Sequence, residues 1–116
     1  MYRRKIEQFI CSEFEPVVQT KAGKLRGYQI NGIYTFRGIR YAKAKRFHMP
    51  EPVDPWDGIV DAQDYGHVCP TRPEHDVVGN LAFPKRYWLA DENCQYLIVW
   101  TEQLDPEAKK PVVVWI

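Results

Sequence analysis

The last six residues of this chain, 111–116, constrain its fold more than any other stretch. They follow a Lys-Lys pair and read Pro-Val-Val-Val-Trp-Ile, an unbroken apolar run rich in β-branched residues. A continuous apolar run, rather than an alternating one, predicts a strand covered on both faces, as in a parallel or mixed sheet flanked by helices. No covering layer follows Ile116. We therefore expect the chain to be a fragment, the opening part of a larger fold, because a solvated central strand would leave much apolar surface exposed.

The composition is that of one globular domain and excludes several classes of function. The chain has 116 residues, 45% of them apolar, and a net charge of +1 from 16 basic and 15 acidic side chains. This balance predicts no nucleic-acid partner and no binding to an anionic membrane. The three cysteines are too few for a disulfide scaffold, and their odd number leaves at least one thiol free.

The sequence carries no sign of a membrane span or a secretory leader. No window approaches the ~20 apolar residues that a spanning helix needs. Polar residues interrupt residues 6–14, so the N-terminus lacks the apolar region of a signal peptide. We therefore expect a cytoplasmic protein, unless a leader was removed before the numbering begins.

The first third of the chain predicts a leader followed by a small antiparallel meander. Residues 1–15 have apolar positions whose spacing fits one face of a short helix, and a disordered leader is the alternative. Residues 17–20, 24–30 and 33–36 are then expected to be strands, with turns between them. The second turn, Asn31-Gly32, is a strong hairpin signal.

The remaining residues up to the final run are mostly irregular. Residues 38–70 carry four prolines and no helical period, and residues 71–91 form a further loop. Residues 95–101 are expected to be a strand, and 105–107 a turn. Strands that come first while helices are still missing are typical of the opening of an α/β protein. We expect residues 16–116 to be the first part of one domain that continues past the chain end.

Most sequence signatures of catalysis or metal binding are absent. There is no Gly-rich phosphate loop, no Cys-x-x-Cys pair and no Gly-x-Ser-x-Gly elbow, and Ser12 is the only serine. A zinc site would have to combine His67, Cys69, His75 and Cys94, but their spacing matches no common structural site. We therefore predict no metal and no cofactor. The pair Cys69 and Cys94 would close a loop if oxidised, and two reduced, buried thiols are the alternative.

Several blocks, taken in order, resemble the type-B carboxylesterases, the family that includes the cholinesterases. The first two are Val18-Gln-Thr-Lys-Ala-Gly-Lys-Leu-Arg-Gly27 and Phe36-Arg-Gly-Ile-Arg-Tyr-Ala42. Arg46-Phe47, Trp56-Asp-Gly58, Asp61-Ala62 and Tyr65-Gly66 continue the order. Glu92-Asn-Cys-Gln-Tyr-Leu-Ile-Val99 resembles the Glu-Asp-Cys-Leu-Tyr-Leu-Asn-Val signature, and Lys110-Pro-Val-Val-Val-Trp-Ile116 matches the strand before the oxyanion segment. The resemblance covers about residues 17–116. It departs at Arg40, where the family has proline, and at Asn93, Gln95 and Ile98.

This resemblance implies an α/β-hydrolase fold, with an antiparallel entry hairpin, a long loop and then strands of a central mixed sheet. It implies ester hydrolysis by a serine, histidine and acidic triad with a backbone oxyanion hole. In the family these groups come later in the chain, so we expect no catalytic residue here and no activity from this piece alone. The expected partner of the whole enzyme is a small carboxylic ester.

The resemblance also assigns roles to six residues of this chain. It implies an ion pair between Arg46 and Glu92 near the base of the loop, with two separate exposed charges as the alternative. It implies that Cys69 and Cys94 form the loop-closing disulfide of the family. It places Tyr87 and Trp88 in the loop that lines one wall of the active-site gorge, where they would contact substrate. The alternative is that both aromatic side chains pack the loop against the body of the protein.

Three hypotheses of function remain open from the sequence. The first is the N-terminal segment of a cytoplasmic serine carboxylesterase that acts through an acyl-serine intermediate. The second is a catalytically dead relative that serves as a binding or adhesion domain. The third is a complete small β-domain that ends at Ile116. The sequence leaves the oligomeric state and the acyl and alcohol specificity undetermined.

Overall fold

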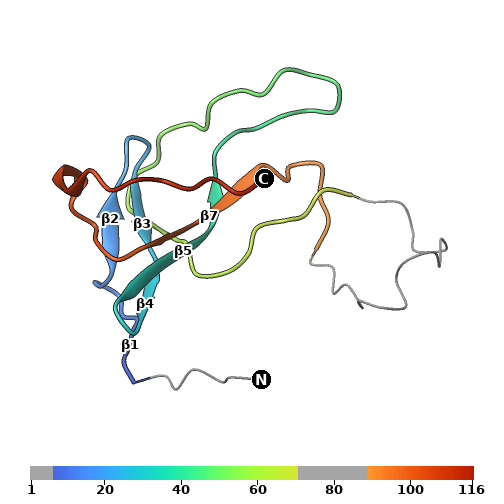
Figure 1. The fold of residues 1–116 in the computed structure, drawn as a ribbon. Helices are drawn as coiled ribbons and strands as arrows, with labels where there is room; N and C mark the ends of the chain where they lie inside the picture. Colours follow the sequence, from blue (N-terminus) through green and yellow to red (C-terminus); the bar gives the residue numbers. More distant parts are fainter. Residues whose placement is uncertain (1–6, 71–88) are drawn as a thin grey trace, which may run out of the picture.

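The computed structural model describes residues 7–70 and 89–116, which form seven short strands and one 3-10 helix (Figure 1). Four strands pair in the order β1-β4-β5-β7, and three in the order β2-β3-β6. No helix within these ranges has the length and apolarity that crossing a membrane demands. The elements are β1 (Phe9–Ile10), β2 (Val17–Gln19), β3 (Lys24–Arg26), β4 (Tyr28–Ile30), β5 (Ile33–Arg40), β6 (Ile59–Asp61), β7 (Tyr96–Thr101) and the 3-10 helix η1 (Pro106–Ala108).

The hairpin predicted at Asn31-Gly32 is confirmed and joins β4 to β5. Both turn residues have positive φ, 47° for Asn31 and 83° for Gly32. This combination is that of a type I′ turn, whose twist matches the twist of paired strands. The antiparallel register that follows sets Ile30 opposite Ile33.

The prediction of one continuous strand over residues 24–30, and hence of a single three-stranded meander, is wrong. Gly27 divides this stretch, so that β3 belongs to one sheet and β4 to the other. A Cβ atom at Gly27 would lie 2.3 Å from the carbonyl oxygen of Thr35 and 2.7 Å from the Phe36 ring. The Gly27 N–H donates to the carbonyl of Pro16 at 3.0 Å. The absence of a side chain at Gly27 therefore lets the chain cross between the sheets where they approach most closely.

Strand β6 was not anticipated within the irregular stretch. It pairs in parallel with β3, so that β3 becomes the middle strand of its sheet. Directly after it, the Ala62 N–H donates to the carbonyl of Arg26, and the Arg37 N–H donates to the carbonyl of Ala62, both at 2.7 Å. Ala62 therefore links the two sheets. A strand of three residues is too short to show the alternation of apolar and polar positions by which strands are predicted.

A small hydrophobic core lies where the two sheets meet. Its centre consists of Leu25, Phe36 and Ala62, which are 4%, 2% and 1% exposed. Burying a side chain the size of Leu or Phe contributes about 1.5–3 kcal/mol. The partly buried side chains that pack against this centre are Val18, Tyr34, Ile39, Trp56 and Leu104.

The helix predicted within the leader does not form in the part of it that the structure describes, residues 7–15. Phe9 and Ile10 instead form β1, paired with Ile30 and Gln29 of β4. An isolated helix of this length is marginal in water, whereas the free edge of β4 offers ready hydrogen-bond partners. The side-chain oxygen of Asn31 adds two more bonds, because it accepts the N–H groups of Glu7 and Gln8 at 2.9 and 3.0 Å.

The strand predicted over residues 95–101 is confirmed as β7, which pairs antiparallel with β5. The pairing shifts register between Phe36 and Ile39, at a bulge where Gly38 has a φ of 64°. At that conformation a side chain is strained, and a Cβ atom would also lie 2.5 Å from the carbonyl oxygen of Asp64. The bulge therefore bends β5 next to the loop that follows β6.

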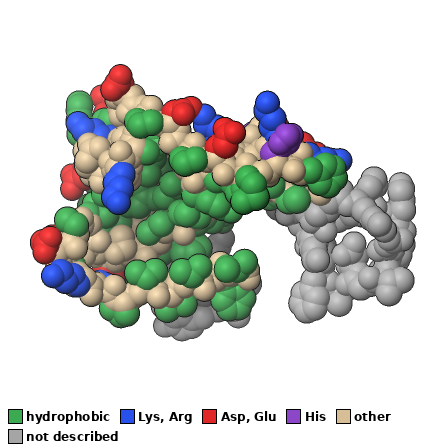
Figure 2. All heavy atoms as spheres, turned by 90° about the horizontal axis from the view of Figure 1, so that it is seen from above, with side chains coloured by type: hydrophobic (Ala, Val, Ile, Leu, Met, Phe, Trp, Pro, Cys, Tyr) green, Lys and Arg blue, Asp and Glu red, His purple; other side chains and the backbone are tan. Residues whose placement is uncertain are grey.

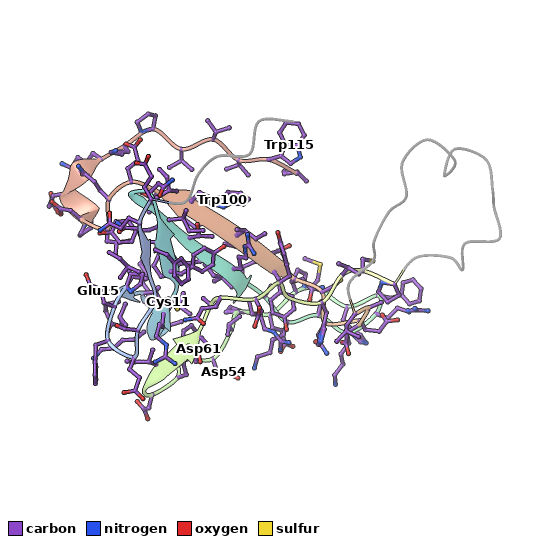
Figure 3. All side chains as sticks on the ribbon, turned by 90° about the horizontal axis from the view of Figure 1, so that it is seen from below. Cys11, Glu15, Asp54, Asp61, Trp100 and Trp115 are labelled. Carbon is purple, nitrogen blue, oxygen red and sulfur yellow. The ribbon has the colours of Figure 1, made fainter. Side chains whose placement is uncertain are left out.

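Residues 111–116 do not form the predicted strand in this structure. From Val112 onward every side chain is at least 76% exposed. Figure 3 shows the segment that carries Trp115 lying apart from β7, which carries Trp100. A strand requires a hydrogen-bonded neighbour, and no described strand runs along this segment. Hydrophobic side chains are spread over the face seen in Figure 2, and the exposed ones include Leu97, Val99 and Trp100 of β7 as well as residues 112–116.

Candidate functional site

Two chain segments that flank residues 71–88 are bound to each other by their backbones. Val68 and Ala90 form a parallel bridge. The Val68 N–H donates to the carbonyl of Leu89 at 3.0 Å, and the Asp91 N–H donates to the carbonyl of Val68 at 3.1 Å. We call residues 66–69 and 89–94 the clamp. Its hydrogen bonds bring the residues before 71 and after 88 to one place without any covalent link.

The structure brings Arg46 and Glu92 together beside the clamp. Arg46 Nε lies 3.2 Å from Glu92 Oε2, and Arg46 Nη2 bonds the other carboxylate oxygen, so the pair is bidentate. The hydrogen bonds from Glu92, followed by its negative charge, raise the pKa of Arg46. The Arg46 and Glu92 side chains are 64% and 49% exposed. The geometry is therefore that of the ion pair which the resemblance implied, but solvent screens it strongly.

Cys69 and Cys94 lie together in the clamp as free thiols. Cys94 is partly buried, whereas Cys69 is exposed. Burial raises the pKa of the Cys94 thiol, and a hydrogen bond with the Cys69 thiol raises it further. Because the thiolate is the reactive form, Cys94 is a poor nucleophile in this arrangement. The structure thus brings the two cysteines of the implied disulfide into contact without joining them.

Asp91 adds a group that the sequence did not single out. Its Oδ1 accepts the N–H of Asn93 at 2.7 Å, which is an Asx turn within the second segment of the clamp. This backbone hydrogen bond lowers the pKa of Asp91, and the positive electrostatic influence of His67 and Arg40 lowers it further. The aspartate followed two positions later by asparagine was the available signal, since both residue types favour such turns.

Tyr96 connects β7 to the clamp and to β5. Arg40 Nη2 donates to the Tyr96 hydroxyl at 2.5 Å. The His67 and Tyr96 rings make an edge-on contact with centroids 6.1 Å apart. A Cβ atom at Gly66 would lie 2.2 Å from the Tyr96 ring, so the glycine is required for this approach. Arg40 stands where the resembled family has proline, and its hydrogen bond to Tyr96 gives that departure a structural role.

An open pocket of about 430 Å³ lies next to these residues. Its walls include Asp64, His67, Leu89 and Tyr96. The buried Nδ1 atom of His67 has no hydrogen-bond partner within residues 7–70 and 89–116. The pocket therefore combines polar and apolar walls, and none of the described residues that line it is a serine, threonine or cysteine that His67 could activate.

The remaining predicted site residues are only partly within the structure. Tyr87 and Trp88, the predicted substrate contacts, lie outside the described residues, and so does His75 of the zinc alternative. Among the residues that the structure describes, no three His, Cys, Asp or Glu side chains come together as metal ligands. Ser12 Oγ is engaged in a local turn, where it accepts the N–H of Glu15 at 3.0 Å.

Comparison with proteins of known sequence gives a consistent result. The chain is 34% identical over 104 residues to the para-nitrobenzyl esterase of Bacillus subtilis, which covers 86% of this chain and 20% of the relative. It is 35% identical over 108 residues to the phenmedipham hydrolase of Pseudarthrobacter oxydans, covering 87% and 21%. It is 39% identical over 114 residues to carboxylesterase 4A of Bos taurus, covering 87% and 20%. The chain thus spans about a fifth of the length of these relatives.

Solved structures agree with this result. An esterase from Clostridium hathewayi, described as hydrolysing aliphatic aromatic polyesters, superposes with a TM-score of 0.78 and 53% identity, over 90% of this chain and 21% of that one. A carboxylesterase from Geobacillus stearothermophilus superposes with a TM-score of 0.59 and 34% identity, over 77% and 17%. These neighbours are α/β-hydrolases, so the predicted fold class is confirmed, with this chain as a part made mostly of strands and loops.

The profile of the Carboxylesterase family matches residues 14–116, which is nearly the whole chain. The matched range includes every described strand except β1, together with the Arg46–Glu92 pair and the clamp. The chain belongs to the carboxylesterase family.

Proposed function

We propose that this chain is the N-terminal portion of a serine carboxylesterase that hydrolyses small carboxylic esters through an acyl-serine intermediate. The observation that carries this proposal is the family match over residues 14–116, combined with coverage of about a fifth of each esterase relative. Acyl transfer of this kind needs a nucleophile, a base and donors to the oxyanion. We assign these groups to the rest of the enzyme.

The described residues are consistent with catalytic groups that lie elsewhere in the enzyme. Ser12, the only serine, has its hydroxyl occupied by the backbone of residues 14 and 15. No histidine contacts it within the described ranges. What these residues do supply is a framework: two sheets that share a core, and a clamp that fixes both flanks of residues 71–88. In the enzyme, this framework sets where that segment enters and leaves.

Substrate contact by Tyr87 and Trp88 is part of the proposal. In the resembled family the segment that carries them lines the active-site gorge, and aromatic side chains there bind the acyl or alcohol group. The 53% identity to an esterase described as acting on aliphatic aromatic polyesters favours aromatic esters among the substrates. We further propose a cytoplasmic enzyme without a nucleic-acid or membrane partner, consistent with the near-neutral charge.

The test is expression of the complete reading frame that encodes this chain. We expect a Gly-x-Ser-x-Gly elbow after residue 116, and turnover of p-nitrophenyl acetate that stops when the elbow serine is replaced by alanine. Hydrolysis of an aromatic polyester film should be measured as a second assay. A folded protein with a substituted nucleophile and no turnover of either substrate would contradict the proposal and favour the binding or adhesion relative.

A further inference from the structure

We propose that the tip of the connection between β5 and β6 is a docking element that inserts into the remainder of the same polypeptide. Figure 1 shows this connection (green) projecting away from both sheets. We call residues 43–54 the arm. The proposal rests on the proposed function, because it requires that the chain be part of a longer enzyme.

The base of the arm is fixed by its own backbone. The Lys43 N–H donates to the carbonyl of Glu51 at 2.9 Å, and the Glu51 N–H donates to the carbonyl of Lys43 at 2.7 Å. At the tip, the His48 N–H donates to the carbonyl of Lys45 at 3.0 Å. Reciprocal bonds at the base and a closed turn at the tip give the arm a defined shape before it meets any partner.

The tip presents two large apolar side chains that the described residues leave largely exposed. Phe47 is 99% exposed and Met49 is 85% exposed. Phe47 also has a φ of 64°, a conformation that is unfavourable for any residue with a side chain. A residue at this position that had only to close a turn would be glycine or asparagine. The arm therefore holds an aromatic side chain outward at a conformational cost.

Two cations of the arm form ion pairs, whereas Lys45 is exposed and forms none with the described residues. Lys43 is bonded to Asp54 within the arm, and Arg46 to Glu92 of the clamp. Phe47 and Met49 make up the apolar part of the tip, beside the exposed Lys45. The part of the socket that receives these two side chains is therefore apolar.

The size of the tip favours a socket in the same polypeptide. An aromatic side chain buries about 150–250 Å², so Phe47 together with Met49 falls well short of the ~800 Å² per partner that a stable association of separate molecules needs. Within one chain the tip and its socket are already linked, so a small contact is enough. The chain spans about a fifth of its relatives' length, which leaves most of such an enzyme to form the socket.

A substitution whose two possible effects have opposite signs tests the proposal in the full-length protein. Phe47→Gly relieves the positive φ but removes the side chain. If the tip docks, Phe47→Gly and Phe47→Ala both lower the melting temperature. If the tip is solvated, Phe47→Gly raises it, and the proposal is overturned. Lys109→Gly is the matched control, because Lys109 is an exposed residue with a φ of 46°, and relief of strain alone should raise the melting temperature there.

Oxidation of Met49 by hydrogen peroxide gives an independent readout by peptide mass spectrometry. We expect Met49 of the native full-length protein to oxidise at least tenfold more slowly than in the urea-unfolded protein. Equal rates would overturn the proposal, and so would protection that disappears on dilution, which would indicate a second copy. Both readouts are independent of turnover: a docked tip in a protein without esterase activity would contradict the proposed function alone.

Discussion

The Tyr96 ring packs directly on the backbone of Gly66, so closely that a Cβ atom on the glycine would approach the ring to 2.2 Å. This contact fixes the position of the clamp relative to β7. The Tyr96 hydroxyl also accepts a hydrogen bond from Arg40, so the ring cannot move aside without losing that bond.

Gly66→Ala should therefore destabilise the full-length protein by about 1–3 kcal/mol, the usual cost of overpacking. Urea denaturation of the variant and the parent measures this difference. In a Tyr96→Leu background the same alanine should cost clearly less, because the ring that it would strike is gone. Equal costs in the two backgrounds would show that the clash does not exist.

Phe36 lies at the centre of the core between the two sheets and is 2% exposed. Phe36→Ala should cost about 3–5 kcal/mol, since it removes buried apolar area and leaves a cavity. Thermal or urea unfolding of the full-length protein checks the value. A loss below about 1 kcal/mol would show that this side chain is not the core residue that the structure makes it.

The ion pair of Arg46 and Glu92 should stabilise the protein in a salt-dependent way. Both side chains are more than one-third exposed, so their attraction is screened as the Debye length shrinks to ~3 Å in 1 M salt. Glu92→Gln should lower the melting temperature slightly at low ionic strength and leave it nearly unchanged at about 1 M NaCl. An effect of equal size at both salt concentrations would point to packing or hydrogen bonding, not charge.

Asp61 should make stability sensitive to acid. The hydrogen bond from Arg26, with Nε and Oδ1 2.6 Å apart, lowers the pKa of Asp61. The Asp61 carboxylate therefore binds a proton less readily in the folded state than in the unfolded state. Its stabilising contribution is complete above the unfolded pKa of about 3.9 and is lost as pH falls through the folded pKa. The melting temperature of the Asp61→Asn variant should therefore fall less than that of the parent protein when the pH is lowered from neutral to below about 3.9.

The control for that experiment is Asp57→Asn. Asp57 is exposed and makes no ion pair in the part of the chain that the structure describes. Its replacement should leave the pH profile of the melting temperature unchanged. If both variants flatten the profile equally, the acid sensitivity comes from overall charge and not from the Arg26–Asp61 pair.

Cys94 should react slowly with iodoacetamide near neutral pH. Burial and the neighbouring Cys69 thiol raise the pKa of Cys94, so little thiolate is present, whereas Cys11 is exposed. Peptide mass spectrometry of the native protein should find Cys11 alkylated first. Rapid alkylation of Cys94 would contradict the arrangement. Protection of both Cys69 and Cys94 until a reductant is added would instead identify them as a disulfide.

The sequence predicted those parts of the fold that depend on local signals. Asn31-Gly32 marked the hairpin because two positive φ angles in succession need such residues. The alternating residues of β7 were equally readable. The division at Gly27 was not, because it depends on Thr35 and Phe36, which approach it only in the folded chain. The strand over residues 111–116 was predicted from composition, but a strand also requires a neighbour.

For the candidate site, residue spacing alone predicted little. Arg46 and Glu92 are separated by 46 positions, and no local pattern pairs them; their pairing came from the family resemblance. The Asx turn of Asp91 and the bond between Arg40 and Tyr96 were both missed, for different reasons. The Arg40–Tyr96 bond joins side chains 56 positions apart, which is a property of tertiary structure, whereas the Asx turn had the local signal of Asp91 and Asn93.

The parallel pairing of β3 with β6 has a consequence for synthesis on the ribosome. Strands β2 and β3 emerge early, but the partner that completes their sheet is not translated until residues 59–61. A nascent chain halted before that point must keep Leu25, only 4% exposed in the folded protein, accessible to water or to a chaperone. The hairpin of β2 and β3 therefore cannot complete its sheet until the ribosome has synthesised β6.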